Sequence, residues 1–130
     1  GPGDLFSSII PNLLVEGMPS AIKRSKAKVV FVCNIMTKFG ETTGFSAEDF
    51  LHALEKYLGK NIVDYVVVNK TRPSRARVRK YEKEKAEFVR YDKALLRQRV
   101  KNVLEADLLR SQGFIRHDSD KLAKVLFSFL

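Results

Sequence analysis

The first eight residues of the chain could bind an anion. Their sequence, Gly-Pro-Gly-Asp-Leu-Phe-Ser-Ser, combines two glycines with two hydroxyl side chains. Glycines let backbone N–H groups come close to a phosphate, and a helix that starts just after them supplies more N–H donors. An ordinary Gly/Pro turn is the alternative interpretation, because the same residue types are common in turns.

A second segment with ligand-binding residue types spans residues 34–44. It contains Asn34, three threonines, Glu41 and two glycines, and it follows a run of apolar residues. Loops that follow strands often hold ligands through amide and hydroxyl hydrogen bonds. The same residues could instead form a capped connection into the next helix, so the residue types alone leave both alternatives open.

The third candidate is the segment Arg116-His117-Asp118. An arginine binds phosphate or carboxylate through two parallel hydrogen bonds. His117 could act as a general base whose tautomer Asp118 would fix, but adjacent side chains rarely point the same way, which favours Asp118 as a helix N-cap. The sequence has two histidines and no nucleophile elbow, so no Ser-His-Asp triad is readable. We therefore assign no catalytic residue and no metal site.

Nearly all of the formal net charge of +9 lies between Lys70 and Arg99, a stretch with twelve basic and four acidic residues. Such a local positive field suits a phosphate-bearing partner, and nucleic acid is one candidate. However, Glu82 and Glu84 alternate with lysines, which is typical of a solvated helix face with helical ion pairs. The sequence has no zinc finger, aromatic RNA-binding motif or leucine zipper. We therefore do not expect nucleic acid as the partner.

Apolar runs and helix signals alternate along the chain. Two apolar runs predict strands covered on both faces, at 28–33 and 62–69. Between them, Ser46 and Asp49 form a capping box for a helix over 47–58, which Gly59 ends. Further helices are predicted around Pro11 and over 19–25, 75–85 and 120–129, and further strands over 87–91 and 103–109.

This alternation predicts an α/β, Rossmann-like fold with a mainly parallel sheet flanked by helices. The 130 residues are enough for one domain with one hydrophobic core. In open sheets of this kind, ligands bind at the carboxyl ends of the strands. The 34–44 segment and the residues after Asn69 would lie there.

The composition excludes several classes of protein. With 45% hydrophobic residues and a single cysteine, the chain is neither a disordered protein nor a disulfide scaffold. The lone Cys33 fits a reducing compartment. The apolar runs are far shorter than the roughly 20 residues of a membrane span, and the first residues lack the features of a signal peptide. We therefore expect a cytoplasmic location and no membrane span.

Three segments together resemble one known family. They are residues 1–15 (GPGDLFSSIIPNLLV), residues 26–42 with KAK, CNIMT and GET, and residues 113–118 (GFIRHD). They occur in the order found in the YvcK-like gluconeogenesis factor family, part of the superfamily of CofD-like 2-phospho-L-lactate transferases. The resemblance covers only the C-terminal portion of a usual member, because nothing here matches the family's N-terminal Gly-rich half.

The resemblance implies that residues 1–130 are a single domain, the C-terminal portion of a CofD-like nucleotide-binding domain. The implied ligand is a nucleotide diphosphate or nucleotide sugar, with UDP-N-acetylglucosamine as the best candidate. The implied role is the regulation of carbon metabolism and of cell wall and cell shape, without established catalysis. The implied partners are the missing N-terminal half or a second copy of the chain. The alternatives are a 2-phospho-L-lactate transferase of deazaflavin coenzyme synthesis and a nucleic-acid binder that uses the basic stretch.

The resemblance also implies a set of site residues. The ligand-binding positions carried over from the family are Gly1, Gly3, Asp4, Ser7, Ser8, Asn34, Thr37, Glu41, Thr42, Tyr81 and Arg116. The chain departs from the family pattern where Asp4 replaces serine, Ser7 replaces threonine, and Lys38-Phe39 replaces Gln-Pro. Asp4 brings a negative charge close to the expected phosphate, which weakens its role there unless a divalent metal intervenes.

Overall fold

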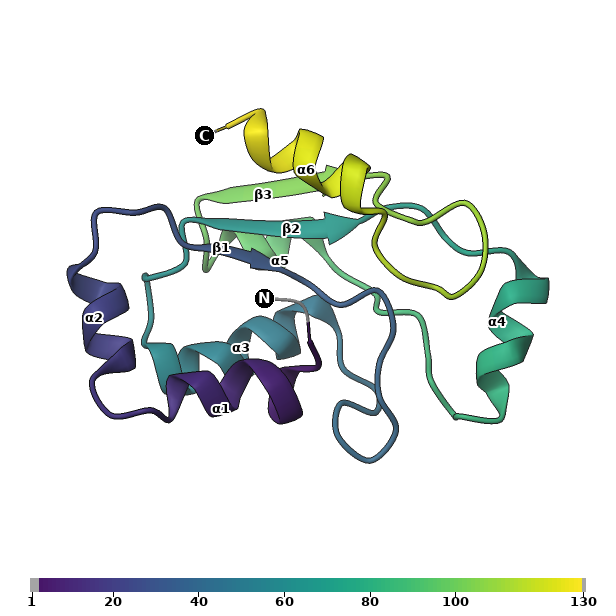
Figure 1. Cartoon of the computed structure of the whole chain (residues 1–130), viewed down its shortest axis with the longest axis horizontal. Helices are drawn as coiled ribbons and strands as arrows, with labels where there is room; N and C mark the ends of the chain where they lie inside the picture. Colours follow the sequence, from purple (N-terminus) through teal and green to yellow (C-terminus); the bar gives the residue numbers. More distant parts are fainter. Residues whose placement is uncertain (1–2, 130) are drawn as a thin grey trace.

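The computed structural model describes residues 3–129 and contains one three-stranded sheet (Figure 1). Its strands are β1 (Val30–Val32), β2 (Tyr65–Asn69) and β3 (Asn102–Ala106), in the order β1-β2-β3. Both pairs are parallel, with Val32 opposite Val67 and Val67 opposite Leu104. The predicted α/β fold with a parallel sheet is therefore confirmed.

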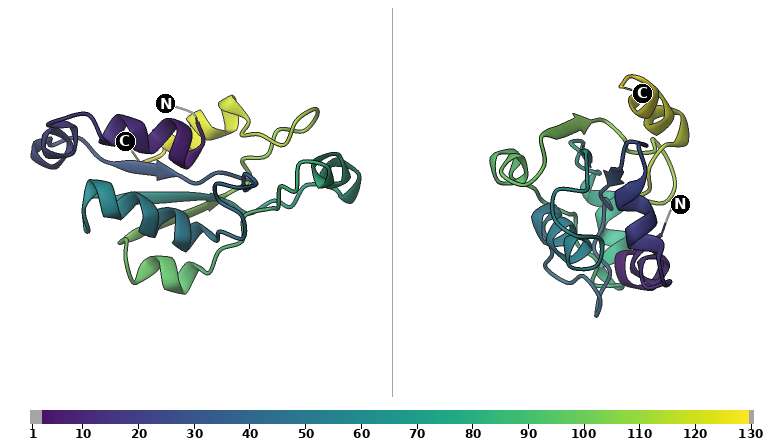
Figure 2. Two further views of the ribbon diagram at one scale, coloured as in Figure 1. Left: turned by 90° about the horizontal axis from the view of Figure 1, so that it is seen from below. Right: turned by 90° about the vertical axis from the view of Figure 1, so that its left-hand side faces the viewer.

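Helices lie on both sides of this sheet (Figure 2). α3 and α5 lie on one side, whereas α6 lies on the other, and α1 and α2 lie beside β1. The bounds are η1 (Leu5–Ile9, a π-helical turn), α1 (Ile10–Leu13), α2 (Met18–Arg24), α3 (Ala47–Leu58), α4 (Arg75–Glu82), α5 (Lys93–Arg97) and α6 (Ser119–Phe127).

α3 forms where its capping box and apolar spacing predict it. The hydroxyl of Ser46 accepts a hydrogen bond from the N–H of Asp49, and the Asp49 carboxylate accepts one from the N–H of Ser46 at 2.8 Å. The buried side of α3 carries Phe50, Leu51, Leu54 and Leu58. Gly59 ends the helix at a φ of 102°, a value that other residues rarely adopt.

The main core lies between the sheet and the α3–α5 side. Successive strand side chains point to opposite faces. Phe31, Val66 and Val103 are neighbours across the three strands, and all three are buried in one cluster with Phe50 and Leu96. Packing in this cluster holds the three strands in place, so their carboxyl ends lie at one edge of the sheet.

The predicted strand over 87–91 is wrong. The segment is extended but makes only one isolated antiparallel bridge, between Phe88 and Met36. Its backbone bonds go to the loop after β1, where the N–H of Thr37 donates to the carbonyl of Glu87 at 2.7 Å. A strand-like residue pattern indicates extended backbone but does not say which partner that backbone pairs with.

Two helices differ from their predicted form. α5 was not predicted, although Asp92 caps it by accepting from the N–H groups of Ala94 and Leu95. It has only five residues, too few for a periodic apolar pattern. α4 ends at Glu82 and not at Lys85, which has a φ of 49°. The predicted strand over 103–109 is confirmed as β3 with shorter bounds.

Within residues 3–129, no single helix is long and apolar enough to cross a membrane. The helical segments Leu5–Leu13 and Met18–Arg24 meet such a length and composition criterion only as a pair, with a bend of 74° between them.

Candidate functional site

The loop that follows β1 is shaped by its own threonines. The hydroxyl of Thr42 accepts from the N–H of Lys38, and the hydroxyl of Thr37 accepts from the N–H of Glu87, both at 2.8 Å. Both threonine side chains are buried. Thr37 and Thr42 therefore use their hydroxyl groups to hold the loop backbone, and this role is structural.

The N-terminal loop meets this loop at the carboxyl end of the sheet. The side-chain amide of Asn34 donates to the carbonyl of Gly3 at 3.3 Å. The ammonium of Lys38 lies 2.9 Å from a carboxylate oxygen of Asp4 and 2.9 Å from one of Glu41. The hydrogen bonds that the ammonium donates to Asp4 and then to Glu41 raise the pKa of Lys38 above its ordinary value. Gly3, Asp4, Asn34 and Glu41 thus lie together, so the structure brings the N-terminal loop and the loop after β1 into contact.

Gly3 has to be glycine for a packing reason. A Cβ atom at this position would lie 2.2 Å from the Cβ of Ser8, far inside van der Waals contact. The close approach occurs because the chain turns directly into η1, where the N–H groups of Ser8 and Ile9 both donate to the carbonyl of Asp4 at 3.0 Å. Ser8 is packed in this turn, Ser7 is exposed, and Gly1 lies outside the described residues.

Tyr81 and Arg116 belong to a second group of residues. The hydroxyl of Tyr81 accepts from the N–H of Ile115 at 2.7 Å. The guanidinium of Arg77 donates to the carbonyls of Arg110 and Phe114, at 2.8 and 3.0 Å. These bonds tie α4 to the segment before α6. Arg116 itself is exposed, and its guanidinium lies 5.5 Å from the ring centre of Phe114.

The two groups are not bonded to each other. Among residues 3–129, no hydrogen bond or ion pair joins the side chain of Tyr81 or Arg116 to Gly3, Asp4 or the 34–42 loop. The structure therefore brings together five of the predicted residues. Tyr81 packs against the apolar cluster that contains Ile35 of the loop after β1, but neither Tyr81 nor Arg116 is bonded to these five. Those five, all in or beside the two loops, are Gly3, Asp4, Asn34, Glu41 and Ser8.

His117 is half-buried, and its backbone pairs with Leu109 in an isolated antiparallel bridge. Burial lowers its pKa, and the neighbouring backbone of Cys33 partly offsets this effect. Its Nε2 atom has no hydrogen-bond partner in the described part of the chain. The Asp118 carboxylate does not orient the imidazole, because it accepts from the N–H groups of Asp120 and Lys121 at the start of α6. The predicted N-cap is therefore confirmed.

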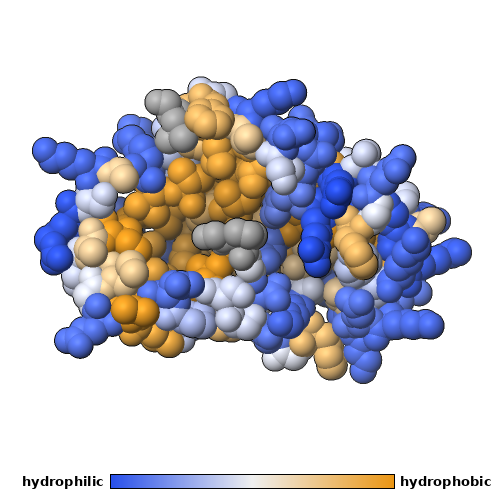
Figure 3. Space-filling model, viewed as in Figure 1, coloured by the Kyte–Doolittle hydropathy of each residue, from blue (hydrophilic) through white to orange (hydrophobic). Residues whose placement is uncertain are grey.

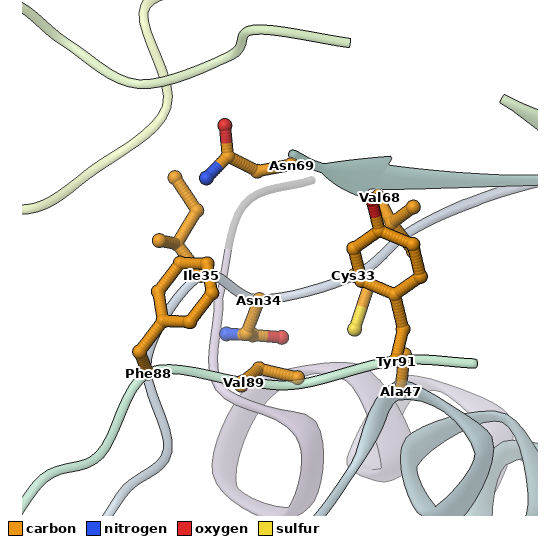
Figure 4. A pocket seen from close by; sticks show the side chains of 9 residues that line it. All are labelled: Cys33, Asn34, Ile35, Ala47, Val68, Asn69, Phe88, Val89 and Tyr91. Carbon is orange, nitrogen blue, oxygen red and sulfur yellow. The ribbon is translucent and has the colours of Figure 1, made fainter. Parts of the chain in front are cut away.

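A small cavity lies at the carboxyl ends of β1 and β2 (Figure 4). Its walls come from the residues after β1, the end of β2 and the segment 88–91. Its volume of about 10 Å³ is about what one water molecule needs. It is too small for a nucleotide, so a ligand of that size would have to lie outside it, over the loops.

Sequence reasoning missed three residues. Lys38 bridges the two loops, Arg77 attaches α4, and the buried Asn69 accepts from the N–H of Leu108 at 3.0 Å. A signal was present for two of them. Asn69 follows its strand as Asn34 follows β1, and Lys38 departs from the family pattern together with Asp4. The two departures carry opposite charges that neutralise each other.

The basic stretch is exposed, as predicted, but it lacks the predicted helical ion pairs. Among the described residues, no basic side chain between Lys70 and Arg90 forms an ion pair. α4 lies apart from the sheet in Figure 1, and none of its residues is buried. Its positive charge is therefore not neutralised by neighbouring carboxylates.

No cluster of three or more metal-binding side chains occurs within residues 3–129. The Asp4 carboxylate, which could hold a divalent metal beside a phosphate, forms an ion pair with the ammonium of Lys38.

Comparison with known proteins gives a consistent result. The family model described as "2-phospho-L-lactate transferase CofD" matches residues 1–109. A putative gluconeogenesis factor of Thermotoga maritima is 44% identical over 97% of this chain and 41% of its own length. The gluconeogenesis factor of Bacillus subtilis is 36% identical over the whole chain and 41% of its own length.

A solved structure has the same fold. A crystal structure of a UPF0052 family member from Bacillus halodurans superimposes with a TM-score of 0.91 at 39% identity. The match covers 98% of this chain and 41% of that one. The chain spans 41% of the length of the Thermotoga maritima relative. It spans 28% of the length of a putative gluconeogenesis factor of Clostridium acetobutylicum.

Proposed function

Because the chain belongs to the CofD family and resembles its gluconeogenesis factors, we propose that it is the C-terminal portion of a cytoplasmic nucleotide-sugar-binding protein. Its ligand is of the UDP-N-acetylglucosamine type, and binding regulates carbon metabolism and cell-wall growth without a catalytic step. One observation carries the proposal. At the carboxyl end of the sheet, Asn34 bonds to Gly3 and Lys38 bonds to Asp4, which joins the two loops.

The chemistry of this joint suits a diphosphate. The Lys38 ammonium is about half exposed. Ser7 is exposed in η1, three residues after Asp4. A cation and a hydroxyl donor are the groups that phosphate oxygens accept from. Lys38 contacts two carboxylates, Asp4 and Glu41, and balances the charge of only one of them. A diphosphate bound here therefore needs at least one further cation. Arg116 would add a second cation from the segment before α6.

The N-terminal loop provides the test. Gly3→Ala should displace this loop, because the added Cβ would collide with Ser8. We expect calorimetric titration of UDP-N-acetylglucosamine at moderate salt to show binding by the unaltered chain and an affinity at least about tenfold weaker for Gly3→Ala, equivalent to 1.4 kcal/mol. Adding Ser8→Gly removes the colliding atom and should restore binding.

Controls separate this proposal from its competitors. UDP alone and a short DNA are titrated under the same conditions. Lys56→Ala is the control, because Lys56 is exposed near the C-terminal end of α3 and forms no ion pair among the described residues. Absence of any binding by the unaltered chain, or equal loss in Gly3→Ala and Lys56→Ala, would contradict the proposal.

The transferase named by the family model is the competing activity. It would join a phospholactyl nucleotide to a deazaflavin. An assay for the deazaflavin product separates this activity from the regulatory role. If a complete protein containing this chain forms the product, the nucleotide is a substrate and not a regulatory ligand. A protein that binds nucleotide sugar and forms no product would support the regulatory role.

A polyanion-binding role for residues 72–85 is a second candidate, favoured by the absence of neutralising ion pairs there. Binding to a short DNA should weaken steeply between 50 and 200 mM salt, because counterions are released on binding. The double change Arg75→Glu and Arg79→Glu should abolish it. The same charge change in α2, with Lys23→Glu and Arg24→Glu, should not.

A further inference from the structure

A second opening in the surface lies at the other end of the sheet from the candidate site. It is a cleft with a volume of about 200 Å³, far larger than the cavity at the carboxyl ends of the strands. Its walls come from the end of α2, the segment 25–29 that leads into β1, and the turn 61–64 that leads into β2. The cleft therefore lies at the amino ends of these two strands (Figure 1).

Hydrogen bonds hold the backbone of both walls in place. The carboxylate of Asp64 accepts from the N–H of Val29 at 2.7 Å, and the N–H of Asp64 donates to the carbonyl of Val29 at 2.8 Å. On the 25–29 segment, the hydroxyl of Ser25 accepts from the N–H of Ala27 at 3.1 Å. The shape of the cleft is therefore fixed without any bond from a lysine side chain.

Three lysines line the cleft, namely Lys23, Lys26 and Lys28. All three are exposed, and none forms an ion pair with another residue in the described part of the chain. The ammonium of Lys23 lies beside the turn of the opposite wall, because a Cβ atom built at Gly59 would lie 2.9 Å from its Nζ atom and 3.7 Å from a side-chain carbon of Ile62. The lysines therefore approach the cleft from both α2 and the 25–29 segment.

The cleft carries an excess of positive charge. Among the residues that line it, three are lysines and one, Asp64, is acidic, so the formal net charge of the lining is two positive. Figure 3 shows hydrophilic side chains at the left end of the molecule, where α2 and the 25–29 segment lie in Figure 1. Ammonium groups that share one cleft repel each other, and an anion bound between them would offset this repulsion.

The side chains of the cleft favour one type of anion. Arginine, whose planar fork fits a carboxylate, does not occur among the described residues that line it, whereas the compact ammonium of lysine binds phosphate as a point charge. A phosphate monoester carries up to about two negative charges at neutral pH, which matches the charge of the lining. The volume lies below the roughly 300 to 1,000 Å³ of pockets for drug-sized ligands, so the organic part has to be small.

We propose that this lysine cleft, lined by Lys23, Lys26 and Lys28, is a second anion site that binds a small phosphate monoester. The side-chain amide of Asn61, which also lines the cleft, offers an uncharged donor to the organic part. The site is separate from the proposed nucleotide-sugar site, whose 34–44 loop follows the opposite end of β1. The proposal therefore stands whether or not the chain binds a nucleotide sugar.

A titration followed by nuclear magnetic resonance tests the proposal. Glycerol 3-phosphate is added to the isotopically labelled chain, and the backbone amide signals are followed. We expect saturable shifts in residues 25–29 and 61–64, and none in residues 3–8 and 34–42. Dimethyl phosphate, a diester with a single charge, should bind at least about tenfold more weakly, and uncharged glycerol should not bind.

A matched pair of double variants locates the site. Lys26→Ala with Lys28→Ala removes two of the three ammonium groups and should weaken the binding of glycerol 3-phosphate at least about tenfold. Lys56→Ala with Lys124→Ala removes the same charge from exposed positions on α3 and α6 that do not line the cleft, and should leave the affinity unchanged. Thermal unfolding checks that both variants fold, and the shifts of the unaltered chain decide the matter if one of them does not.

Three results would overturn the proposal. Glycerol 3-phosphate could cause no saturable shift in residues 25–29 and 61–64. Dimethyl phosphate could bind as tightly as glycerol 3-phosphate, which would mean that the cleft does not distinguish a monoester. The two double variants could lose affinity equally, in which case the effect comes from the overall charge of the chain and not from the cleft.

Discussion

At the scale of single residues, burial decides which ionisable groups near the carboxyl end of the sheet can react. Cys33 and His117 are neighbours there, and both are shielded from water. Lys38 and Asp4 are half exposed and paired with each other. Lys38 and Asp4 therefore face solvent, whereas burial favours the neutral forms of Cys33 and His117.

The Cys33 thiol should be inert in the folded protein. It is 2% exposed, and burial together with the charge of Glu48 raises its pKa well above the ordinary range. The thiolate is the reactive form, so both access and ionisation are blocked. We expect a chromogenic disulfide reagent at pH 8 to label no thiol in the native protein and one thiol per chain in denaturant. Rapid labelling of the native protein would contradict this.

His117 should make the fold sensitive to mild acid. Its pKa is lowered from 6.5 by burial, so the unfolded chain takes up a proton at a higher pH than the folded chain. The stability contributed by neutral His117 is therefore present above pH 6.5 and is lost as pH falls through the folded-state pKa. Urea unfolding midpoints should fall between pH 7 and pH 5. His117→Gln should flatten this dependence.

The other histidine is the matched control for that experiment. His52 is exposed on α3, so His52→Gln should keep the pH dependence of the unaltered chain. If both substitutions flatten it equally, or if neither does, the assignment to His117 is wrong.

At the scale of elements, the effect of a helix N-cap on global stability depends on how much of the core its helix carries. α3 carries a large share of the main core, whereas α4 has no buried residue. Both helices start with a serine whose hydroxyl accepts a backbone hydrogen bond, Ser46 for α3 and Ser74 for α4. The two caps should therefore have different effects on global stability.

Ser46→Ala should lower the free energy of unfolding by about 1 kcal/mol, the usual cost of losing an N-cap. Ser74→Ala should change it much less, because α4 can fray without disturbing the core. Urea denaturation followed by circular dichroism measures both. Equal losses would mean that α4 is coupled to the core more tightly than its burial indicates.

At the scale of the whole molecule, the sheet with α3 forms the stable centre, and α4 and α6 lie at its margin. Val66, Val67 and Val68 of β2 are almost fully buried, while neither α4 nor α6 buries a residue. Local opening needs less free energy where few apolar contacts are lost.

Amide hydrogen exchange followed by mass spectrometry should reflect this arrangement. Peptides from α4 and α6 should exchange first, and peptides from β2 and α3 should exchange last, near the rate of global unfolding. If α6 exchanged as slowly as β2, the helix would be packed against the sheet more tightly than the exposure of its side chains indicates.

Local patterns in the sequence determined most of the elements. The apolar runs of β1 and β2, the capping box of α3 and the cap of α6 at Asp118 are interactions between residues close in the chain, so they can be read without the fold. The sequence also predicted that the 34–44 segment would lie at the carboxyl end of the sheet, because it follows a strand. It gave no sign that Gly3 and Asp4 would contact this segment.

Only the tertiary structure decided what these segments pair with. The segment 87–91 is extended, as its residues favour, but it bonds to the loop after β1 and not to the sheet. Thr37 and Thr42 have hydroxyls suited to a ligand, but Thr42 accepts from the backbone of its own loop and Thr37 accepts from the N–H of Glu87. Lys38 reaches Asp4 across 34 positions of sequence. Partner choice between distant segments depends on packing and burial, which no local pattern encodes.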